Sequence, residues 1–162
     1  MSTLKIKFSE FISLVWPIGL LPIAPGTISS LLAAFLGFLI NTYFGSDLTL
    51  FLAFLTGILG WYTTKIYIAK IDDKDPSEVV IDEFSGQLIA TAVAGTSLLF
   101  NFMAFILFRF FDILKPGIIK KAEKLSGSTG IMMDDWIAGF VSALFILLFS
   151  SLDSIKYNWF IM

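Results

Sequence analysis

The stretch Asp72-Asp-Lys-Asp-Pro-Ser-Glu-Val-Val-Ile-Asp-Glu83 separates long apolar runs and carries six of the thirteen acidic residues of the chain. Its last two residues, Asp82 and Glu83, lead directly into another apolar segment. An ionised carboxylate beside a membrane segment is costly unless a group of opposite charge binds it. We therefore expect a divalent metal ion to pair with the end of this stretch at a membrane surface.

The composition around this stretch is that of a membrane protein. Of the 162 residues, 57% are hydrophobic and only 15% are charged, and the mean hydropathy is +0.87. The length predicts a single domain over residues 1–162, and the apolar runs are long enough to cross a bilayer. The expected fold class is all-α, a polytopic membrane bundle of about five helices.

The residue types that are missing restrict the chemistry. The chain has no cysteine and no histidine, which excludes disulfides, thiolate nucleophiles, imidazole acid–base catalysis and soft zinc sites. Carboxylates, lysine, arginine, hydroxyl groups and a hard metal ion remain available.

Apolar runs and the breaks between them predict where the helices lie. Thr27 or Ser30 can cap the first long helix, and Asp75, Pro76 and Glu78 form the pattern of a helix start. A short amphipathic helix over 3–16 and a solvated turn there are equally consistent with the sequence. The five expected helices cover about residues 27–43, 48–69, 76–93, 98–114 and 134–151, and residues 115–133 are expected to form a polar loop.

Two breaks in the apolar pattern carry a structural meaning. Residues 19–27 contain two prolines and two glycines, so this broken apolar segment must be buried in protein or line a cavity. Gly95-Thr96-Ser97 predicts a helical hairpin in the middle of the chain. The loops at 65–83 and 109–135 are both rich in lysine or arginine, and the hairpin places both on the cytoplasmic side of the membrane.

Five carboxylates abut apolar runs, and the hairpin brings them to one face. We predict that they hold a metal ion, with magnesium favoured because it takes one or two carboxylates together with water and phosphate oxygens. The predicted metal ligands are Asp82, Glu83, Asp112, Asp134 and Asp135. Arg109 and Lys115 lie close to them in sequence and are expected to hold a phosphate group.

Other polar residues have simpler explanations. Asp72 and Asp73 are expected to be solvated, and Asp75 and Glu78 to cap a helix. A surface patch for anionic lipid is the expected role of three lysines, Lys120, Lys121 and Lys124. Two turns before helices, which contain Thr27 and Gly130, are candidates for binding phosphate through backbone N–H groups.

Four stretches in consistent order resemble one family. They are Gly19-Leu-Leu-Pro-Ile-Ala-Pro-Gly-Thr27, Asp75-Pro-Ser-Glu-Val-Val-Ile-Asp-Glu-Phe-Ser-Gly-Gln87, Phe108-Arg-Phe-Phe-Asp-Ile-Leu-Lys-Pro116 and Gly130-Ile-Met-Met-Asp-Asp-Trp-Ile-Ala-Gly139. Together they make the chain similar to the phosphatidylglycerophosphatase A family of bacterial membrane lipid phosphatases.

The resemblance implies an enzyme, a phosphoric monoester hydrolase of phosphatidylglycerol biosynthesis. It implies Mg²⁺-dependent hydrolysis of phosphatidylglycerophosphate to phosphatidylglycerol and phosphate, by a multi-pass protein of the bacterial inner membrane whose active site is on the cytoplasmic face. The expected partners are the membrane and a phospholipid substrate, with no nucleic acid. On this basis the catalytic residues are Asp82, Glu83, Asp112 and Asp135, and the substrate-binding residues are Arg109, Lys115, Thr27 and Gly130.

Two questions stay open at the level of sequence. Water could attack the phosphate directly, or a carboxylate could form an aspartyl-phosphate. A divalent-cation transporter and a non-enzymatic membrane adaptor are alternative functions, although a transporter would need polar groups near the bilayer midplane.

Overall fold

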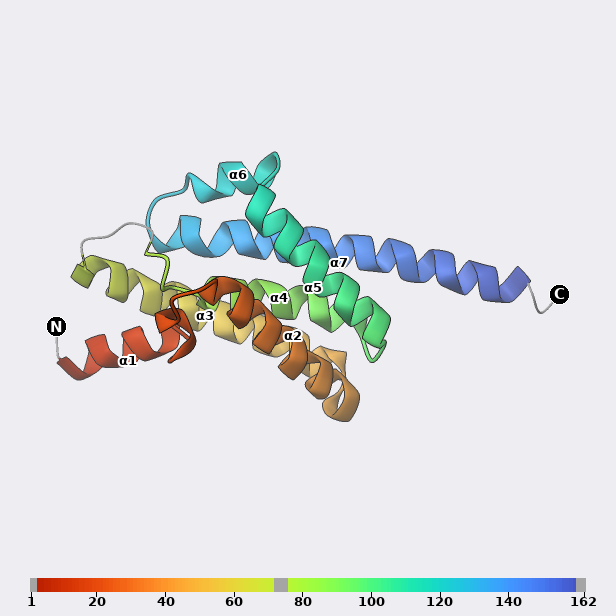
Figure 1. Ribbon diagram of the computed structural model, residues 1–162, viewed down its shortest axis with the longest axis horizontal. Coiled ribbons are helices and arrows are strands. Elements are labelled where there is room, and N and C mark those ends of the chain that lie inside the picture. The colour runs from red at the N-terminus through yellow and green to blue at the C-terminus, as the bar shows by residue number, and fades with distance from the viewer. Residues whose placement is uncertain (1–2, 72–75, 160–162) are drawn as a thin grey trace.

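The chain forms a helical bundle in the computed structural model, which describes residues 3–71 and 76–159 and their side chains as far as Leu152. No strand occurs in these residues, which confirms the all-α fold class. Helices α3, α4 and α7 run lengthwise, α2 and α5 cross them obliquely, and α1 and the end of α7 lie toward opposite ends of the molecule (Figure 1). The elements of the described residues are α1 Thr3–Ser13, η1 (a 3-10 helix) Ile18–Leu20, α2 Pro25–Phe44, α3 Ser46–Ile71, α4 Ile81–Ala94, α5 Leu98–Leu114, α6 Ile118–Glu123 and α7 Ser128–Trp159.

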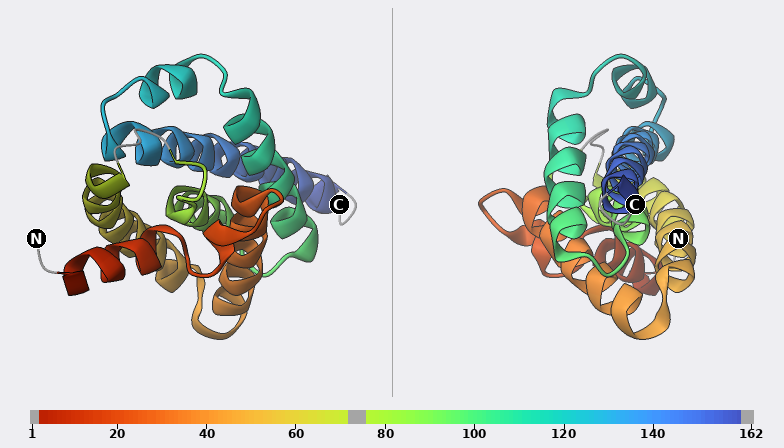
Figure 2. Two further views of the ribbon diagram at one scale, coloured as in Figure 1. Left: turned by 60° about the vertical axis from the view of Figure 1, so that its left-hand side comes forward. Right: turned by 90° about the vertical axis from the view of Figure 1, so that its right-hand side faces the viewer.

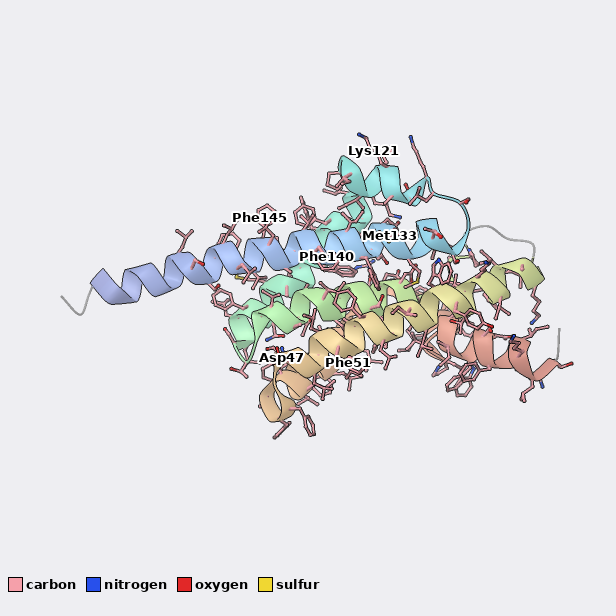
Figure 3. All side chains as sticks on the ribbon, turned by 180° about the vertical axis from the view of Figure 1, so that it is seen from behind. Asp47, Phe51, Lys121, Met133, Phe140 and Phe145 are labelled. Atoms are coloured by element: carbon pink, nitrogen blue, oxygen red, sulfur yellow. The ribbon has the colours of Figure 1, made fainter. Side chains whose placement is uncertain are left out.

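Small side chains fill the inside of the bundle, and large apolar side chains cover its outside. The core includes fully buried alanines, namely Ala33, Ala53, Ala90, Ala104 and Ala138. Phe51, Phe140 and Phe145 point outward from α3 and α7 (Figure 3) and are exposed. Membrane helices pack through small residues, whereas a soluble protein rarely exposes so much apolar surface.

Three segments, α2, α3 and residues 128–152 of α7, are long and apolar enough to cross a membrane. The 20 residues of α2 extend roughly 30 Å at 1.5 Å per residue, about the thickness of the hydrocarbon core. Together with the exposed apolar belt, these helices mark the chain as a membrane protein.

The predicted hairpin is confirmed by α4 and α5. Gly95 ends α4 with a positive φ of 58°, and Ser97 caps α5, its hydroxyl oxygen accepting a hydrogen bond from the N–H of Phe100 (3.3 Å). Figure 1 shows α5 leading back at an angle to α4 from their connection, and Arg109 on α5 lies 3.9 Å from Glu83 in the first turn of α4. As a result the first turn of α4 and the last turn of α5 lie at the same end of the bundle.

The predicted start of a helix at Pro76 is wrong, because α4 begins at Ile81. The side chain of Glu78 does not cap a helix, but accepts a hydrogen bond from the hydroxyl of Tyr67 on α3. The expectations for Asp72, Asp73 and Asp75 fall outside the described residues. The shift matters because Asp82 and Glu83 now lie in the first turn of α4, where the helix dipole favours negative charge.

Two other boundaries also differ from the prediction. Neither Thr27 nor Ser30 caps α2, which begins at Pro25 after Ala24, a residue in the left-handed conformation (φ 46°). Residues 115–133 are not a continuous loop, because they contain α6 and the beginning of α7. Because α7 begins at Ser128 rather than Asp134, six helical residues precede the Asp134-Asp135 pair, which therefore lies within α7 and not at its beginning.

The crossing of α4 and α7 depends on two glycines. A Cβ atom added at Gly139 would lie 2.3 Å from the carbonyl oxygen of Gly86, and one added at Gly86 would lie 2.6 Å from the carbonyl oxygen of Asp135. The two backbones are therefore in direct contact, as in small-residue packing of membrane helices. This contact brings Asp135 next to the first turn of α4.

Candidate active site

A cavity of about 1190 Å³ opens at the end of the bundle where α2, α4 and α7 begin and α5 ends. Its walls come from residues 19–27, residues 76–83, the end of α5, and the segment from α6 to the second turn of α7. The prediction that the broken apolar segment at 19–27 lines a cavity is thus confirmed. All eight residues predicted for catalysis or substrate binding line this cavity, as does Asp134.

Three of the five predicted carboxylates converge. One oxygen each from Asp82, Glu83 and Asp135 lies within 4.8 Å of the others. Asp82 and Asp135 are buried, and Glu83 is nearly so. The Oε2 atom of Glu83 and the Oδ1 atom of Asp135 are buried without a hydrogen-bond partner. Ionised carboxylate oxygens that are buried without a partner are costly, so a bound cation would stabilise this arrangement.

The other two carboxylates each face a side-chain cation instead. Asp112 pairs with Arg109 one turn earlier on α5, with Nη1 and Oδ2 2.5 Å apart. The same Nη1 donates a hydrogen bond to the Ser30 hydroxyl at 3.3 Å and lies 3.9 Å from Oε1 of Glu83. Arg109 therefore joins α5 to α2 and α4, and does not extend out to solvent.

Lys115 is held between two acidic residues at the end of α5. Its Nζ donates hydrogen bonds to Asp134 Oδ2 (2.7 Å) and Glu123 Oε1 (2.9 Å). Burial by itself lowers the pKa of Lys115, but these two hydrogen bonds raise it by more, so the pKa lies above its ordinary value. Lys115 is therefore charged at neutral pH and supplies a fixed positive charge on one wall of the cavity.

Thr27 and Gly130 line the cavity in different ways. Thr27 lies in the first turn of α2, where backbone N–H groups have no partner within the helix. The N–H of Gly130 already donates to the carbonyl of Gly127 (3.0 Å), and a Cβ at Gly130 would lie 2.2 Å from the carbonyl oxygen of Leu125. Gly130 thus allows close packing of the turn, and its N–H is not free for phosphate.

Sequence reasoning missed one residue that shapes the acidic group. A Cβ atom at Gly26 would lie 1.9 Å from Oε1 of Glu83, so a side chain there would displace the carboxylate from its position beside α2. The Pro25-Gly26-Thr27 motif suggested phosphate binding through the backbone, but not this contact. The signal was present, since a glycine in the first turn of an otherwise strongly apolar helix indicates a close approach.

The residues present fit a hard divalent cation such as Mg²⁺. The donors are all oxygen atoms, which is the ligand type that Mg²⁺ prefers. Seven carboxylic acid side chains and three basic side chains, Arg109, Lys115 and Lys124, line the cavity, so acidic groups outnumber basic groups by four. Asp82, Glu83 and Asp135 would hold the ion, because Asp112 and Asp134 already have cationic partners.

Comparison with known proteins identifies the family. The family model described as Phosphatidylglycerophosphatase A matches residues 11–150. Phosphatidylglycerophosphatase A of Haemophilus influenzae is 37% identical over 130 residues, which cover 79% of this chain and 80% of the relative. The protein of the same name from Escherichia coli K12 is 34% identical over 128 residues, covering 77% of this chain and 73% of the relative.

A Bacteroides thetaiotaomicron protein, whose name provisionally assigns it a phosphatidylinositol-3-phosphatase activity, is 37% identical over 136 residues, covering 79% of this chain and 84% of the relative. No solved structure matches the chain. Both relatives named for the family and the match over most of the chain support an enzyme that acts on phosphate monoesters, rather than a transporter or an adaptor. The chain belongs to the phosphatidylglycerophosphatase A family.

Proposed function

We propose that this enzyme hydrolyses phosphatidylglycerophosphate to phosphatidylglycerol and phosphate with Mg²⁺ as cofactor. The observation that carries the proposal is the convergence of Asp82, Glu83 and Asp135, with two unpartnered buried oxygens, in a cavity that also holds Arg109 and Lys115. Anionic ligands alone would repel a phosphate group. A divalent cation between these carboxylates and the phosphate resolves that conflict.

In this proposal different residues bind the metal ion and the phosphate group of the substrate. Asp82, Glu83 and Asp135 would hold Mg²⁺, which when bound supplies positive charge to phosphate oxygens and makes water a stronger nucleophile at neutral pH. Arg109 and Lys115 contribute positive charge where the phosphate develops negative charge in the transition state. Asp112 and Asp134 orient these two cations through the ion pairs at 2.5 Å and 2.7 Å.

The first turn of α2 offers uncharged hydrogen-bond donors for the phosphate. Its N–H groups at Gly26 and Thr27 have no partner within the helix and lie in the wall of the cavity beside Glu83. The beginning of a long helix favours anions. In this proposal the phosphate lies between α2 and the Arg109 side chain, with its ester oxygen toward the lipid.

Location follows from the same arrangement. We propose that the enzyme lies in the bacterial inner membrane with the cavity at the cytoplasmic face, because Lys115 and Lys124 line the cavity and lysine-rich connections favour the cytoplasmic side. A lipid phosphomonoester with an inositol headgroup is the second candidate substrate, favoured by the Bacteroides relative.

The test is phosphate release by the purified protein from phosphatidylglycerophosphate in detergent micelles, with and without Mg²⁺. Removing Mg²⁺ with a chelator should abolish release. Asp82→Asn and Asp135→Asn should lower kcat by at least about a hundredfold, the usual effect of removing one electrostatic group from an active site. Asp47→Asn is the control and should leave the rate unchanged, because Asp47 lies in the first turn of α3 (Figure 3), at the end of the bundle away from the cavity.

Two outcomes would overturn the proposal. One is phosphate release that persists without divalent cations, and the other is full activity in both site variants. A preference for phosphatidylinositol-3-phosphate over phosphatidylglycerophosphate would show that the substrate is an inositol lipid. The proposed metal-assisted hydrolysis of a phosphate monoester would still stand. Trapping of a phosphorylated carboxylate would show covalent catalysis instead of direct attack by water.

A further inference from the structure

We propose that the connection at residues 20–24 and the outer face of α2 bind the acyl chains of the lipid substrate while its headgroup occupies the cavity. This inference rests on the proposed function, since it assigns the apolar part of the same substrate to a place on the protein. It defines an apolar subsite outside the charged cavity.

The rim of the cavity is chemically asymmetric. On one side Leu20, Leu21 and Pro22 line it. Leu20 and Leu21 are 58% and 39% exposed, and the neighbouring Ile23 is 77% exposed. Lys115, Lys124 and the polar turn at residues 126–127 line another part of the cavity. Such a rim matches an amphiphile in one orientation, with phosphates toward the lysines and acyl chains toward the leucines.

The apolar side of the rim is a fixed feature of the backbone. The connection between η1 and α2 stands out from the bundle (Figure 2). At its base, the N–H groups of Leu20 and Leu21 donate to the carbonyls of Pro17 (3.1 Å) and Ile18 (3.0 Å). A Cβ at Gly19 would lie 2.0 Å from the carbonyl oxygen of Glu78, so the base is packed against the turn before α4.

An apolar track continues from this rim along α2. Ile28, Leu31 and Phe35 recur at helical spacing and are all exposed, whereas the residues between them that face α4 are buried and small. From Ile28 to Phe35 the track is roughly 10 Å long at 1.5 Å per residue. Because α2 crosses the membrane, the track leads from the headgroup cavity into the hydrocarbon region.

The covalent structure of the substrate requires such a route. The acyl chains are bonded to the headgroup, so they must leave the cavity at an apolar side or be exposed to water, which is unfavourable for every methylene group. On the lysine side Leu125 is 49% exposed, but it stands alone between Lys124 and Ser126, whereas residues 20–23 form a continuous apolar stretch. The acyl chains therefore leave the cavity past Leu20 and Leu21.

The test compares two substrates in two matched variants. Leu20→Ala/Leu21→Ala removes apolar surface from the proposed subsite. Leu144→Ala/Leu147→Ala removes it from α7, where these leucines are 56% and 50% exposed. Each protein is assayed on dioleoyl phosphatidylglycerophosphate in detergent micelles and on the water-soluble deacylated headgroup, glycerophosphoglycerophosphate.

The readout is the ratio of kcat/KM for the long-chain substrate to kcat/KM for the deacylated headgroup. The Leu20/Leu21 variant should lower this ratio about tenfold, mainly through KM, from the lost apolar contact. The Leu144/Leu147 variant should leave the ratio unchanged. An unchanged ratio in the Leu20/Leu21 variant would overturn the inference. An equal fall of the ratio in both variants would also overturn it, because exposed leucines would then only anchor the protein in the micelle.

A second measurement covers the case of a poorly folded variant. A phosphatidylglycerophosphate with a photoreactive diazirine on its acyl chain should label wild-type residues 18–35. Excess phosphatidylglycerophosphate should prevent this labelling, and excess phosphatidylcholine should not. Labelling spread evenly over all exposed helices would refute the subsite. If the wild type hydrolysed neither substrate, the proposed function would fail, whereas hydrolysis with an unchanged ratio would refute only the acyl-chain subsite.

Discussion

At the scale of single residues, two acidic pairs that look alike in sequence have different surroundings. In Asp82-Glu83 and in Asp134-Asp135 the first aspartate accepts a hydrogen bond from the next backbone N–H, at 3.0 Å in both cases. The other oxygen of Asp134 binds Lys115, whereas Asp82 lies with Glu83 and Asp135. One pair therefore divides its two carboxylates between a lysine and the proposed metal site.

The Lys115–Asp134 ion pair gives a prediction about stability. Lys115→Met leaves the buried Asp134 carboxylate without its cation, which should lower the free energy of unfolding by about 3 kcal/mol. The double variant Lys115→Met/Asp134→Asn should recover much of this loss, because it leaves no unpaired charge. Chemical denaturation in detergent micelles, with α-helical circular dichroism as the signal, measures both.

A surface ion pair provides the control for that measurement. Lys70 and Glu10 are 3.2 Å apart, but both side chains are well exposed. Lys70→Met should therefore cost less than about 1 kcal/mol. Equal losses for Lys70→Met and Lys115→Met would mean that Asp134 finds another partner when Lys115 is absent.

At the scale of elements, the site depends on how closely α4 and α7 approach each other. Asp82 and Glu83 come from the first turn of α4 and Asp135 from the second turn of α7. Gly86 and Gly139 lie one turn beyond these carboxylates, and their backbones are in contact. The distance between the helices at this crossing therefore sets the distance between the carboxylates.

Gly139→Ala tests this crossing, because the sign of the change in unfolding free energy depends on whether the two helices are in contact. In an unconstrained helix the change would stabilise the protein by up to about 1 kcal/mol. Here the added methyl group meets the backbone of Gly86, so we expect a loss of about 1–3 kcal/mol in unfolding free energy and a loss of phosphatase activity. Leu144→Ala, at an exposed position of α7, should change the unfolding free energy by less than about 0.5 kcal/mol. A more stable Gly139→Ala variant would contradict the close crossing.

At the scale of the whole molecule, one end of the bundle carries the chemistry and the other carries short turns. The cavity lies where α2, α4 and α7 begin and α5 ends, and the connections at Gly45 and Gly95 lie at the far end. Polar residues within the bundle, such as Asn41 and Thr91, hydrogen-bond to one another: Asn41 Nδ2 donates to the Thr91 carbonyl at 2.8 Å. Both polar atoms of the buried Asn41 side chain have partners inside the bundle, whereas Glu83 Oε2 and Asp135 Oδ1 at the cavity have none.

This arrangement predicts which turns share a side of the membrane. Because the chain has no cysteine, single cysteines can be introduced at Ser77, Ser126 and Thr96, all of which are exposed. A membrane-impermeant maleimide should label Ser77→Cys and Ser126→Cys from one side, which we expect to be the cytoplasmic side, and Thr96→Cys only from the other. Labelling of Thr96→Cys and Ser126→Cys from the same side would contradict the hairpin in the membrane.

The sequence predicted most of the fold because helix formation in a membrane protein is local. Apolar runs of sufficient length and the breaks at Gly45 and Gly95–Ser97 determine α2, α3 and the α4–α5 hairpin. The errors lie at polar boundaries, where the pattern is weak. The turn at residues 76–80 resembles a helix start at Pro76, but the N–H of Val80 donates to the carbonyl of Ser13 (3.0 Å), a contact that is distant in sequence.

The amino-acid sequence by itself determined that the chain is a helical membrane protein whose carboxylates gather at one end, because hydrophobic length and helix breaks act through neighbouring residues. Only the tertiary structure decided which carboxylates meet. Asp82, Glu83 and Asp135 converge, and Asp112 and Asp134 pair with Arg109 and Lys115. That division depends on backbone contact between helices some fifty residues apart in the chain, at Gly86 and Gly139, and on the space that Gly26 leaves for Glu83.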